Sequence, residues 1–228
     1  MEAGGAPMRE AERRRMVSTQ LVARGITDPL VLQAMREVPR ECFVRASMVD
    51  RAYHDGPLPI GHGQTISQPY IVAAMTAAAR LKPGVRVLEI GTGSGYGAAV
   101  VSRIAAEVYT VERVSALAAA AAARLARLGY ANVHVREGDG SRGWPEHAPY
   151  DAILVTASGP RVPEALLEQL AVGGRLVMPV GVSLAQRLVR VTRTEADEHQ
   201  YDDLSSPGEA DDVRAQLPRD LQHVWEDA

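Results

Sequence analysis

Residues 85–97 read VRVLEIGTGSGYG. The apolar run at the start of this stretch predicts a buried strand, and Tyr96–Ala105 predicts a helix. Three alternate glycines, Gly91, Gly93 and Gly95, connect the two elements. Glycine permits a tight turn and a close approach of the backbone to a ligand, while the start of a helix offers free N–H groups. The stretch therefore predicts a turn that binds a cofactor.

A regular alternation of strands and helices surrounds this turn. Such alternation implies crossover connections between parallel strands. We expect an α/β fold with a doubly wound, mostly parallel sheet, in which ligands bind beyond the carboxyl ends of the strands. The predicted strands are Val85–Ile90, Glu107–Val111, Val133–Arg136, Ala152–Thr156, Gly174–Pro179 and Arg187–Arg193. The predicted helices of this part are Ile71–Arg80, Tyr96–Ala105, Ser115–Leu128 and Pro163–Leu170.

The chain before this alternation has a different character. Two helices are predicted within residues 16–44. The first ends at Gly25, and the second begins at Asp28, a capping side chain that precedes an early proline. Residues 52–70 are crowded with glycine and proline and predict a loop. A loop of this length inside a compact domain is usually functional or disordered.

Composition favours a single globular domain. The 228 residues are 46% apolar, which is enough for a sizeable core. No apolar run approaches the roughly 20 residues that span a bilayer, and the N-terminus lacks the apolar segment of a secretory signal. The single cysteine excludes an internal disulfide, and the six histidines show no metal-ligand spacing. We expect a cytoplasmic protein without a metal or a membrane partner.

The net charge of −3 is unevenly distributed. Residues 195–228 hold eleven acidic and two basic side chains, a net charge of −9, so the rest of the chain carries +6. An acidic terminal segment is typical of a solvated or disordered tail. The mildly basic remainder suits an anionic peptide substrate. It lacks the dense lysine and arginine patches of nucleic-acid-binding proteins, so we expect no nucleic acid partner.

Acidic side chains follow three successive predicted strands. Glu89 lies just before the first glycine, Glu112 ends the strand VYTVE, and Asp139 follows the third strand. Glu89 would repel a pyrophosphate and attract an ammonium or sulfonium group. Glu112 is placed to accept two ribose hydroxyls, and Asp139 to accept a hydrogen bond from an adenine amino group. Glycine spacing alone also fits NAD or FAD, since a G-x-G-x-x-A frame ends at Ala98. The three acids favour S-adenosylmethionine.

Six segments in order carry a resemblance to a known family. They read LPIGHGQTISQPYIVAAMT, VLEIGTGSGY, VYTVER, GDG, APYDAILVT and LLEQLAVGGRLVMPVG. With them the chain resembles protein-L-isoaspartate O-methyltransferases over roughly residues 16–193. The resemblance implies a class I, Rossmann-like methyltransferase fold with an N-terminal helical addition. It also implies methyl transfer from S-adenosylmethionine to the free carboxylate of L-isoaspartyl residues in damaged proteins or peptides. The ester then closes to a succinimide, which starts repair. We expect a monomer.

The resemblance also implies the roles of individual residues. Ser67 corresponds to the active-site serine of the family. We interpret Ser67 as a hydrogen-bond donor that orients the substrate carboxylate, because a carboxylate is already ionised at neutral pH and is itself the nucleophile. The alternative is that Ser67 caps the helix that follows. The expected cofactor-binding residues are Gln64, Thr65, Ile66, Glu89, Gly91, Gly93, Gly95, Glu112, Asp139 and Gly140.

These expectations divide the chain into four parts. Residues 1–15 are predicted to be a disordered extension, 16–70 to hold the N-terminal helices and the substrate loop, and 71–194 to bind S-adenosylmethionine. Residues 195–228 are predicted to be an acidic, divergent tail. Bacterial family members commonly end in a strand like VRFVPL, whereas the corresponding segment here, 211–218, reads DDVRAQLP. This departure leaves two alternatives open: methylation of an aspartate in a dedicated precursor peptide, or a cofactor-binding partner protein without turnover.

Overall fold

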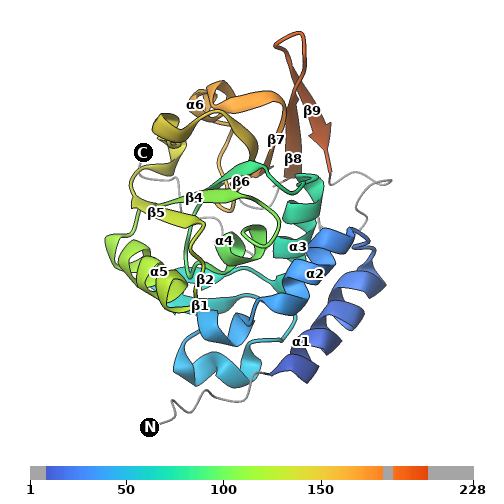
Figure 1. Cartoon of the computed structure of the whole chain (residues 1–228), viewed down its shortest axis with the longest axis vertical. Helices are drawn as coiled ribbons and strands as arrows, with labels where there is room; N and C mark the ends of the chain where they lie inside the picture. The colour runs from blue at the N-terminus through green and yellow to red at the C-terminus, as the bar shows by residue number, and fades with distance from the viewer. Residues whose placement is uncertain (1–8, 182–186, 205–228) are drawn as a thin grey trace.

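The computed structural model describes residues 9–181 and 187–204. A seven-stranded sheet in the order β5-β4-β3-β6-β7-β8-β9 runs through the molecule (Figure 1). The strands are β3 (Arg86–Ile90), β4 (Glu107–Glu112), β5 (Val133–Glu137), β6 (Tyr150–Val155), β7 (Leu170–Val180), β8 (Arg187–Arg193) and β9 (His199–Asp203). The first five strands in this order pair in parallel, and β8 and β9 join by antiparallel pairing. The predicted doubly wound, mostly parallel sheet is confirmed.

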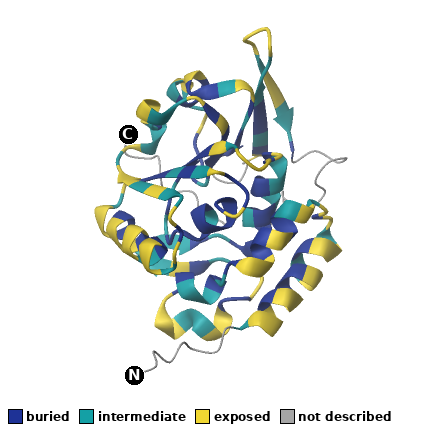
Figure 2. Ribbon diagram, in the orientation of Figure 1, coloured by how far each residue is buried: buried dark blue, intermediate teal, exposed yellow. Residues whose placement is uncertain are grey.

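Helices cover the sheet on both faces. One core cluster joins β3, β4 and β6 to the N-terminal helices and to α3 (Pro69–Ala78), α4 (Tyr96–Val101) and α5 (Ser115–Arg127). A second cluster, on the other face, joins the same strands to α6 (Glu164–Glu168). Figure 2 shows the buried residues along the strands and the exposed residues on the outer sides of α1, α2 and α5. The chain passes from β3 outward to β5 and returns to β6, so the switch point lies between β3 and β6.

The N-terminal part is helical from Glu10. Helix α1 (Glu10–Met16) continues through a π-helical turn, Val17–Leu21, and a short 3-10 turn that ends at Gly25. Gly25 adopts a φ of +88°, the left-handed conformation that glycine tolerates best. Helix α2 (Pro29–Glu37) begins where predicted, with Asp28 as the cap. The predicted disorder of residues 1–15 is therefore wrong from Glu10 onward. The acids in the first turn of α1 and the arginines in its last turn stabilise the helix, because each lies near the end of the helix dipole with the opposite charge.

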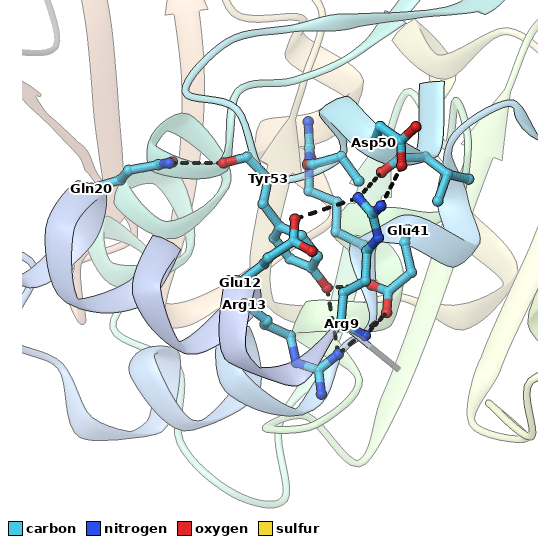
Figure 3. A network of polar contacts seen from close by, with 10 residues as sticks. Arg9, Glu12, Arg13, Gln20, Glu41, Asp50 and Tyr53 are labelled. Atoms are coloured by element: carbon cyan, nitrogen blue, oxygen red, sulfur yellow. Dashed lines mark hydrogen bonds and ion pairs between the residues drawn. The ribbon is translucent and has the colours of Figure 1, made fainter. Parts of the chain in front are cut away.

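A buried polar network ties α1 to residues 40–53 (Figure 3). The Nε of Arg13 donates to the carbonyl oxygen of Arg36 at 2.5 Å, and Nη1 lies 3.8 Å from the carboxylate of Glu41. The hydroxyl of Tyr53 donates to that same carboxylate. Gln20, from the π-helical turn, donates to the carbonyl oxygen of Tyr53 at 2.8 Å. The network therefore fixes the chain just before the stretch that begins at residue 52.

The stretch 52–70, predicted as a loop, contains a hairpin. Strands β1 (Leu58–Gly61) and β2 (Gln64–Ile66) pair in an antiparallel manner. The strands are short, and the surrounding glycines and prolines hide their pattern in the sequence. Ile60 on β1 packs against the glycine turn, since a Cβ built on Gly93 would lie 3.3 Å from its Cδ1. The hairpin therefore covers the turn after β3.

The C-terminal boundary also differs from the expectation. Residues 199–203, predicted to belong to an acidic tail, form the edge strand β9. Two of the acids pair with arginines of β8: Asp202 lies 2.9 Å from Arg190, and Asp203 lies 3.2 Å from Arg187. Acidic side chains are thus compatible with a strand here because the neighbouring strand is basic. The divergent segment 211–218 lies outside the described residues.

In the two described ranges, no helix is long and apolar enough to cross a membrane.

Candidate functional site

A cavity of about 460 Å³ opens at the carboxyl ends of the central strands. Its floor comes from the turns after β3, β4, β5 and β6, and β2 with the residues after it forms a second wall. Ten of the eleven predicted site residues line the cavity: Gln64, Thr65, Ile66, Ser67, Glu89, Gly91, Gly93, Glu112, Asp139 and Gly140. Gly95 is the exception. It does not line the cavity, and a Cβ built there would lie 3.1 Å from Leu125, so it permits close packing of α4 on α5.

The glycine turn is held by its neighbour after β6. Gly91 and Gly93 have φ values of +95° and +52°, a region that side chains other than glycine rarely adopt. A Cβ on Gly91 would lie 2.3 Å from the hydroxyl oxygen of Thr156. That hydroxyl lies 2.9 Å from the carbonyl oxygens of both Ile90 and Gly91 and donates to them. Gly91 and Gly93 line the cavity, so its surface here is a cradle of backbone atoms without side chains.

Glu112 connects this turn to the end of β4. One carboxylate oxygen accepts the N–H of Gly93 at 2.8 Å, and the other accepts the N–H of Val114 at 2.9 Å. The side chain is buried yet lines the cavity. Each carboxylate oxygen can accept more than one hydrogen bond. Glu112 can therefore hold the glycine turn and still accept the two hydroxyls of a ribose.

Glu89 is a buried carboxyl group in the same floor. It is 2% exposed and accepts a hydrogen bond from the hydroxyl of Thr110 at 2.7 Å. Burial raises the pKa of Glu89 to about 8; the Thr110 hydrogen bond opposes this rise, and the charge of Glu112 adds to it. A cationic group bound beside Glu89 would compensate for the burial of its negative charge.

The turn after β5 completes the floor. Asp139 caps a short 3-10 turn, Gly140–Arg142, and its Oδ1 accepts hydrogen bonds from the backbone N–H and the hydroxyl of Ser141. Its other oxygen lies 3.5 Å from Nε of Arg142. A Cβ on Gly140 would lie 2.3 Å from Ile90, so only glycine fits against the floor of the cavity. Asp139 is exposed at the cavity wall, where it can accept a hydrogen bond from an adenine amino group.

Ser67 lies between β2 and α3 and lines the same cavity as Glu89 and Glu112. The alternative that it caps α3 is wrong, because the capping residue is Gln68 and no side chain there makes a capping hydrogen bond. Ser67 is half-buried and lines the cavity. Within the described ranges, no hydrogen bond engages its hydroxyl, which leaves it available to a ligand.

Polar contacts from distant residues hold this wall. Gln68 donates to Asp55 at 2.7 Å, and the other oxygen of Asp55 lies 3.3 Å from a guanidinium nitrogen of Arg24. That guanidinium also stacks 3.6 Å above the centre of the Tyr70 ring. Asp55 therefore serves to fix the loop rather than to act as a base.

Two threonines of the site, Thr92 and Thr110, were not identified from the sequence. Thr92 lines the cavity, and Thr110 lies directly behind Glu89. A signal for Thr110 was present, because it is the polar residue inside the otherwise apolar strand VYTV and stands opposite Glu89 in the β3–β4 register. Recognising it required the register of the two strands, which composition does not provide. In the described ranges, no three histidine, cysteine or acidic side chains are grouped to hold a metal.

Comparison with known proteins agrees with this geometry. The protein-L-isoaspartate O-methyltransferase 1 of Rhodopseudomonas palustris is 64% identical over 196 residues, which cover 86% of this chain and 80% of that protein. The protein-L-isoaspartate O-methyltransferase of a Synechococcus species is 66% identical over 173 residues, covering 76% of this chain and 71% of its own.

A solved structure has the same fold. It comes from Plasmodium falciparum, is described as a protein-L-isoaspartate O-methyltransferase, and contains S-adenosyl-L-homocysteine. It superposes with a TM-score of 0.73 at 27% identity and covers 84% of this chain and 94% of that one. The model of the family protein-L-isoaspartate(D-aspartate) O-methyltransferase matches residues 11–206. With the relatives above, this match shows that the chain belongs to the protein-L-isoaspartate(D-aspartate) O-methyltransferase family.

Proposed function

We propose that this protein transfers a methyl group from S-adenosylmethionine to the free α-carboxylate of L-isoaspartyl residues in damaged proteins and peptides. The observation that carries this proposal is that Ser67 and the carboxylates Glu89 and Glu112 line one cavity. The carboxylates suit a cationic nucleoside, and the serine suits an anionic acceptor. The backbone amide nitrogen of the next residue can then attack the carbonyl carbon of the methyl ester, with methanol as the leaving group, to close a succinimide. Water opens this ring, partly to normal aspartate.

Three acidic side chains are assigned to the cofactor. Glu89 faces its ammonium group, Glu112 accepts hydrogen bonds from the ribose hydroxyls, and Asp139 accepts one from the adenine amino group. The bare backbone at Gly91 and Gly93 lets the cofactor lie close to the turn. When bound, S-adenosylmethionine supplies an electrophilic methyl group on a sulfonium ion.

The remaining task of the chain is to position the acceptor. A carboxylate with a pKa near 4 is ionised at neutral pH, so no general base is needed. The hydroxyl of Ser67 donates a hydrogen bond to one carboxylate oxygen and leaves the other free to attack the methyl carbon. Gln64, Thr65 and Ile66, which were predicted to bind the cofactor, line the same cavity next to Ser67, and we assign them to the contact with the cofactor beside the acceptor. Orientation of this kind contributes several kcal/mol to catalysis, with an upper limit of about 7–11 kcal/mol.

The test is methyl transfer from labelled S-adenosylmethionine to a short isoaspartyl peptide, with the matching aspartyl peptide as control. We expect transfer to the isoaspartyl peptide alone. Equal transfer to both peptides would contradict the proposed selectivity. Binding of S-adenosylmethionine without transfer to either peptide would favour a precursor-peptide substrate or a cofactor-binding partner protein. The cytoplasmic location, the monomeric state, and the lack of metal, nucleic acid and membrane partners stay predictions.

A further inference from the structure

Thr110 is the hydrogen-bond partner of Glu89 inside the sheet. Thr110 is fully buried, and its hydroxyl lies 2.7 Å from Oε2 of Glu89. The other oxygen of Glu89 faces α4, where a Cβ on Gly97 would lie 2.3 Å from it. The carboxyl group is therefore confined between a hydroxyl on β4 and the bare backbone of α4. It lines the cavity at this point.

A second hydroxyl orients the first. The oxygens of Thr92 and Thr110 lie 2.7 Å apart, and both residues are buried. A hydroxyl group has one proton to donate. If Thr110 gives its proton to Glu89, the proton between the threonines must come from Thr92. The two hydrogen bonds then run in one direction: Thr92 donates to Thr110, and Thr110 donates to the carboxyl group of Glu89.

The charges near Glu89 are mostly negative. The ionisable side chains that line the cavity with it are Glu112 and Arg113 after β4, Glu137 and Asp139 around the end of β5, and Tyr96 on α4. Glu112 is the one that acts on Glu89, and it raises the Glu89 pKa. The segments packed on Glu89 from α3 and β6 contribute Ile71, Val72, Met75, Thr76, Leu154 and Thr156, none of which ionises. No lysine, arginine or histidine in the described ranges forms an ion pair with Glu89.

These contacts imply that Glu89 holds a proton when no cation is beside it. An isolated buried carboxylate is costly, and such a group takes up a proton instead of remaining charged. The raised pKa of about 8 is consistent with this argument from geometry. An ammonium group in the cavity shifts Glu89 from the neutral acid to the carboxylate, because a nearby positive charge favours the ionised form.

We propose that Thr110 is a positioning residue that acts through Glu89, and that Glu89 releases one proton to solvent when the ammonium group of the cofactor binds. The proton balance is simple: the carboxylic acid of Glu89 and a ligand ammonium give a carboxylate–ammonium pair and one proton for the buffer. This inference rests on the proposed function, since it takes S-adenosylmethionine as the ligand. It adds that binding tightens as pH rises, by roughly tenfold between pH 6 and pH 7.

The experiment is calorimetric titration of the whole chain with S-adenosyl-L-homocysteine at pH 6.5, in two buffers of different ionisation enthalpy. At this pH the amino group of the ligand is largely protonated, since α-amino groups have pKa values of about 7.7–8.0. We expect close to one proton released for each ligand bound. Methylthioadenosine, which has the adenine and ribose but no ammonium group, should bind without this release. Binding of S-adenosyl-L-homocysteine without proton release would overturn the inference and leave the proposed function intact. Absence of any binding would overturn the proposed function as well.

Variants separate the role of Thr110 from plain packing. Glu89→Gln should abolish proton release. Thr110→Val keeps the shape of the side chain and removes the hydroxyl, so the pKa of Glu89 in the ligand-free protein should rise, by about one unit. Carbon-13 NMR of glutamate-labelled protein follows this titration directly, and the signal missing in Glu89→Gln identifies Glu89. Thr110→Ser, the conservative variant, should restore the original titration. An unchanged Glu89 titration in folded Thr110→Val would show that Thr110 only packs.

Discussion

The two walls of the cavity are built in different ways. The floor, from the ends of β3 to β6, is held by backbone hydrogen bonds and by residues close to the glycine turn in space, such as Glu112 and Thr156. The second wall, Gln64–Ser67, is held by side chains from distant parts of the chain: Gln68 contacts Asp55, and Asp55 contacts Arg24. The floor is part of the sheet, whereas the wall Gln64–Ser67 is held in place by side-chain contacts.

This difference implies that the two binding tasks can be disturbed separately. A change in the sheet wall should weaken cofactor binding, because its backbone forms the cradle. A change that misplaces Ser67 alone should lower turnover, because it leaves the glycine turn and the carboxylates of the floor intact. An enzyme that binds by one rigid element and positions by another can vary its acceptor without rebuilding its cofactor site.

The largest effect is expected from Gly91→Ala. The residue would need a φ of +95° and would bring a Cβ to 2.3 Å from the hydroxyl of Thr156. Strain of this kind costs about 1–3 kcal/mol, so affinity for S-adenosyl-L-homocysteine should fall roughly ten- to a hundredfold. Calorimetry measures the loss. Gly129→Ala is the matched control: φ is +79° there but nothing lies within 4 Å, so stability should fall while affinity stays.

Ser67→Ala should lower kcat roughly tenfold to a hundredfold, about 1.4–2.7 kcal/mol, which is at or below the lower end of the cost of removing one preorganised oxyanion-hole donor. Initial rates with a saturating isoaspartyl peptide give this value. The exposed Ser47, which lies outside the cavity, supplies the control Ser47→Ala. Unchanged turnover in Ser67→Ala would show that the serine does not orient the acceptor carboxylate.

A smaller effect concerns stability and pH. The folded protein holds a proton on Glu89 up to about pH 8, whereas an unfolded glutamate loses it near its ordinary value of 4.5. The stabilising effect of the neutral form is thus complete below pH 4.5 and is lost as pH rises through 8. Glu89→Gln keeps a neutral side chain at both pH values. In the ligand-free protein the substitution should therefore raise the free energy of unfolding at pH 8 by on the order of 1–3 kcal/mol more than it does at pH 5. Thermal unfolding at both pH values checks this; an equal effect at the two would refute it.

The smallest effect is expected from Asp55→Ala, which releases Gln68 and Arg24. Gln68 is buried and Arg24 half-buried, but Asp55 itself is exposed, so the free energy of unfolding should fall by only about 1 kcal/mol. Turnover should fall several-fold, with cofactor affinity preserved. Asp50, a highly exposed acid that pairs with Arg9 at the other end of the N-terminal part, gives the control Asp50→Ala. Loss of cofactor affinity in Asp55→Ala would show that the two walls are coupled.

The same division explains what the sequence could predict. The strands, the glycine turn and the acids at the strand ends follow from local patterns, and Glu89 and Glu112 lie in the cavity as expected. The hairpin Leu58–Ile66 and the strand His199–Asp203 did not follow, because their pairing depends on partners elsewhere in the fold. Gly95 followed the glycine pattern but serves helix packing. Spacing alone cannot distinguish a glycine that faces a ligand from one that faces a helix.

The most direct test of the two-wall account is the affinity for S-adenosyl-L-homocysteine of two variants, Glu112→Ala and Ser67→Ala, compared with the unmodified chain. Glu112→Ala removes the acceptor of the Gly93 N–H and the proposed ribose contact, whereas Ser67→Ala changes only the acceptor wall. We predict a loss of affinity of tenfold or more, about 1.4 kcal/mol, for Glu112→Ala and none for Ser67→Ala. Equal losses in both variants would contradict the account, because the cavity would then act as one unit.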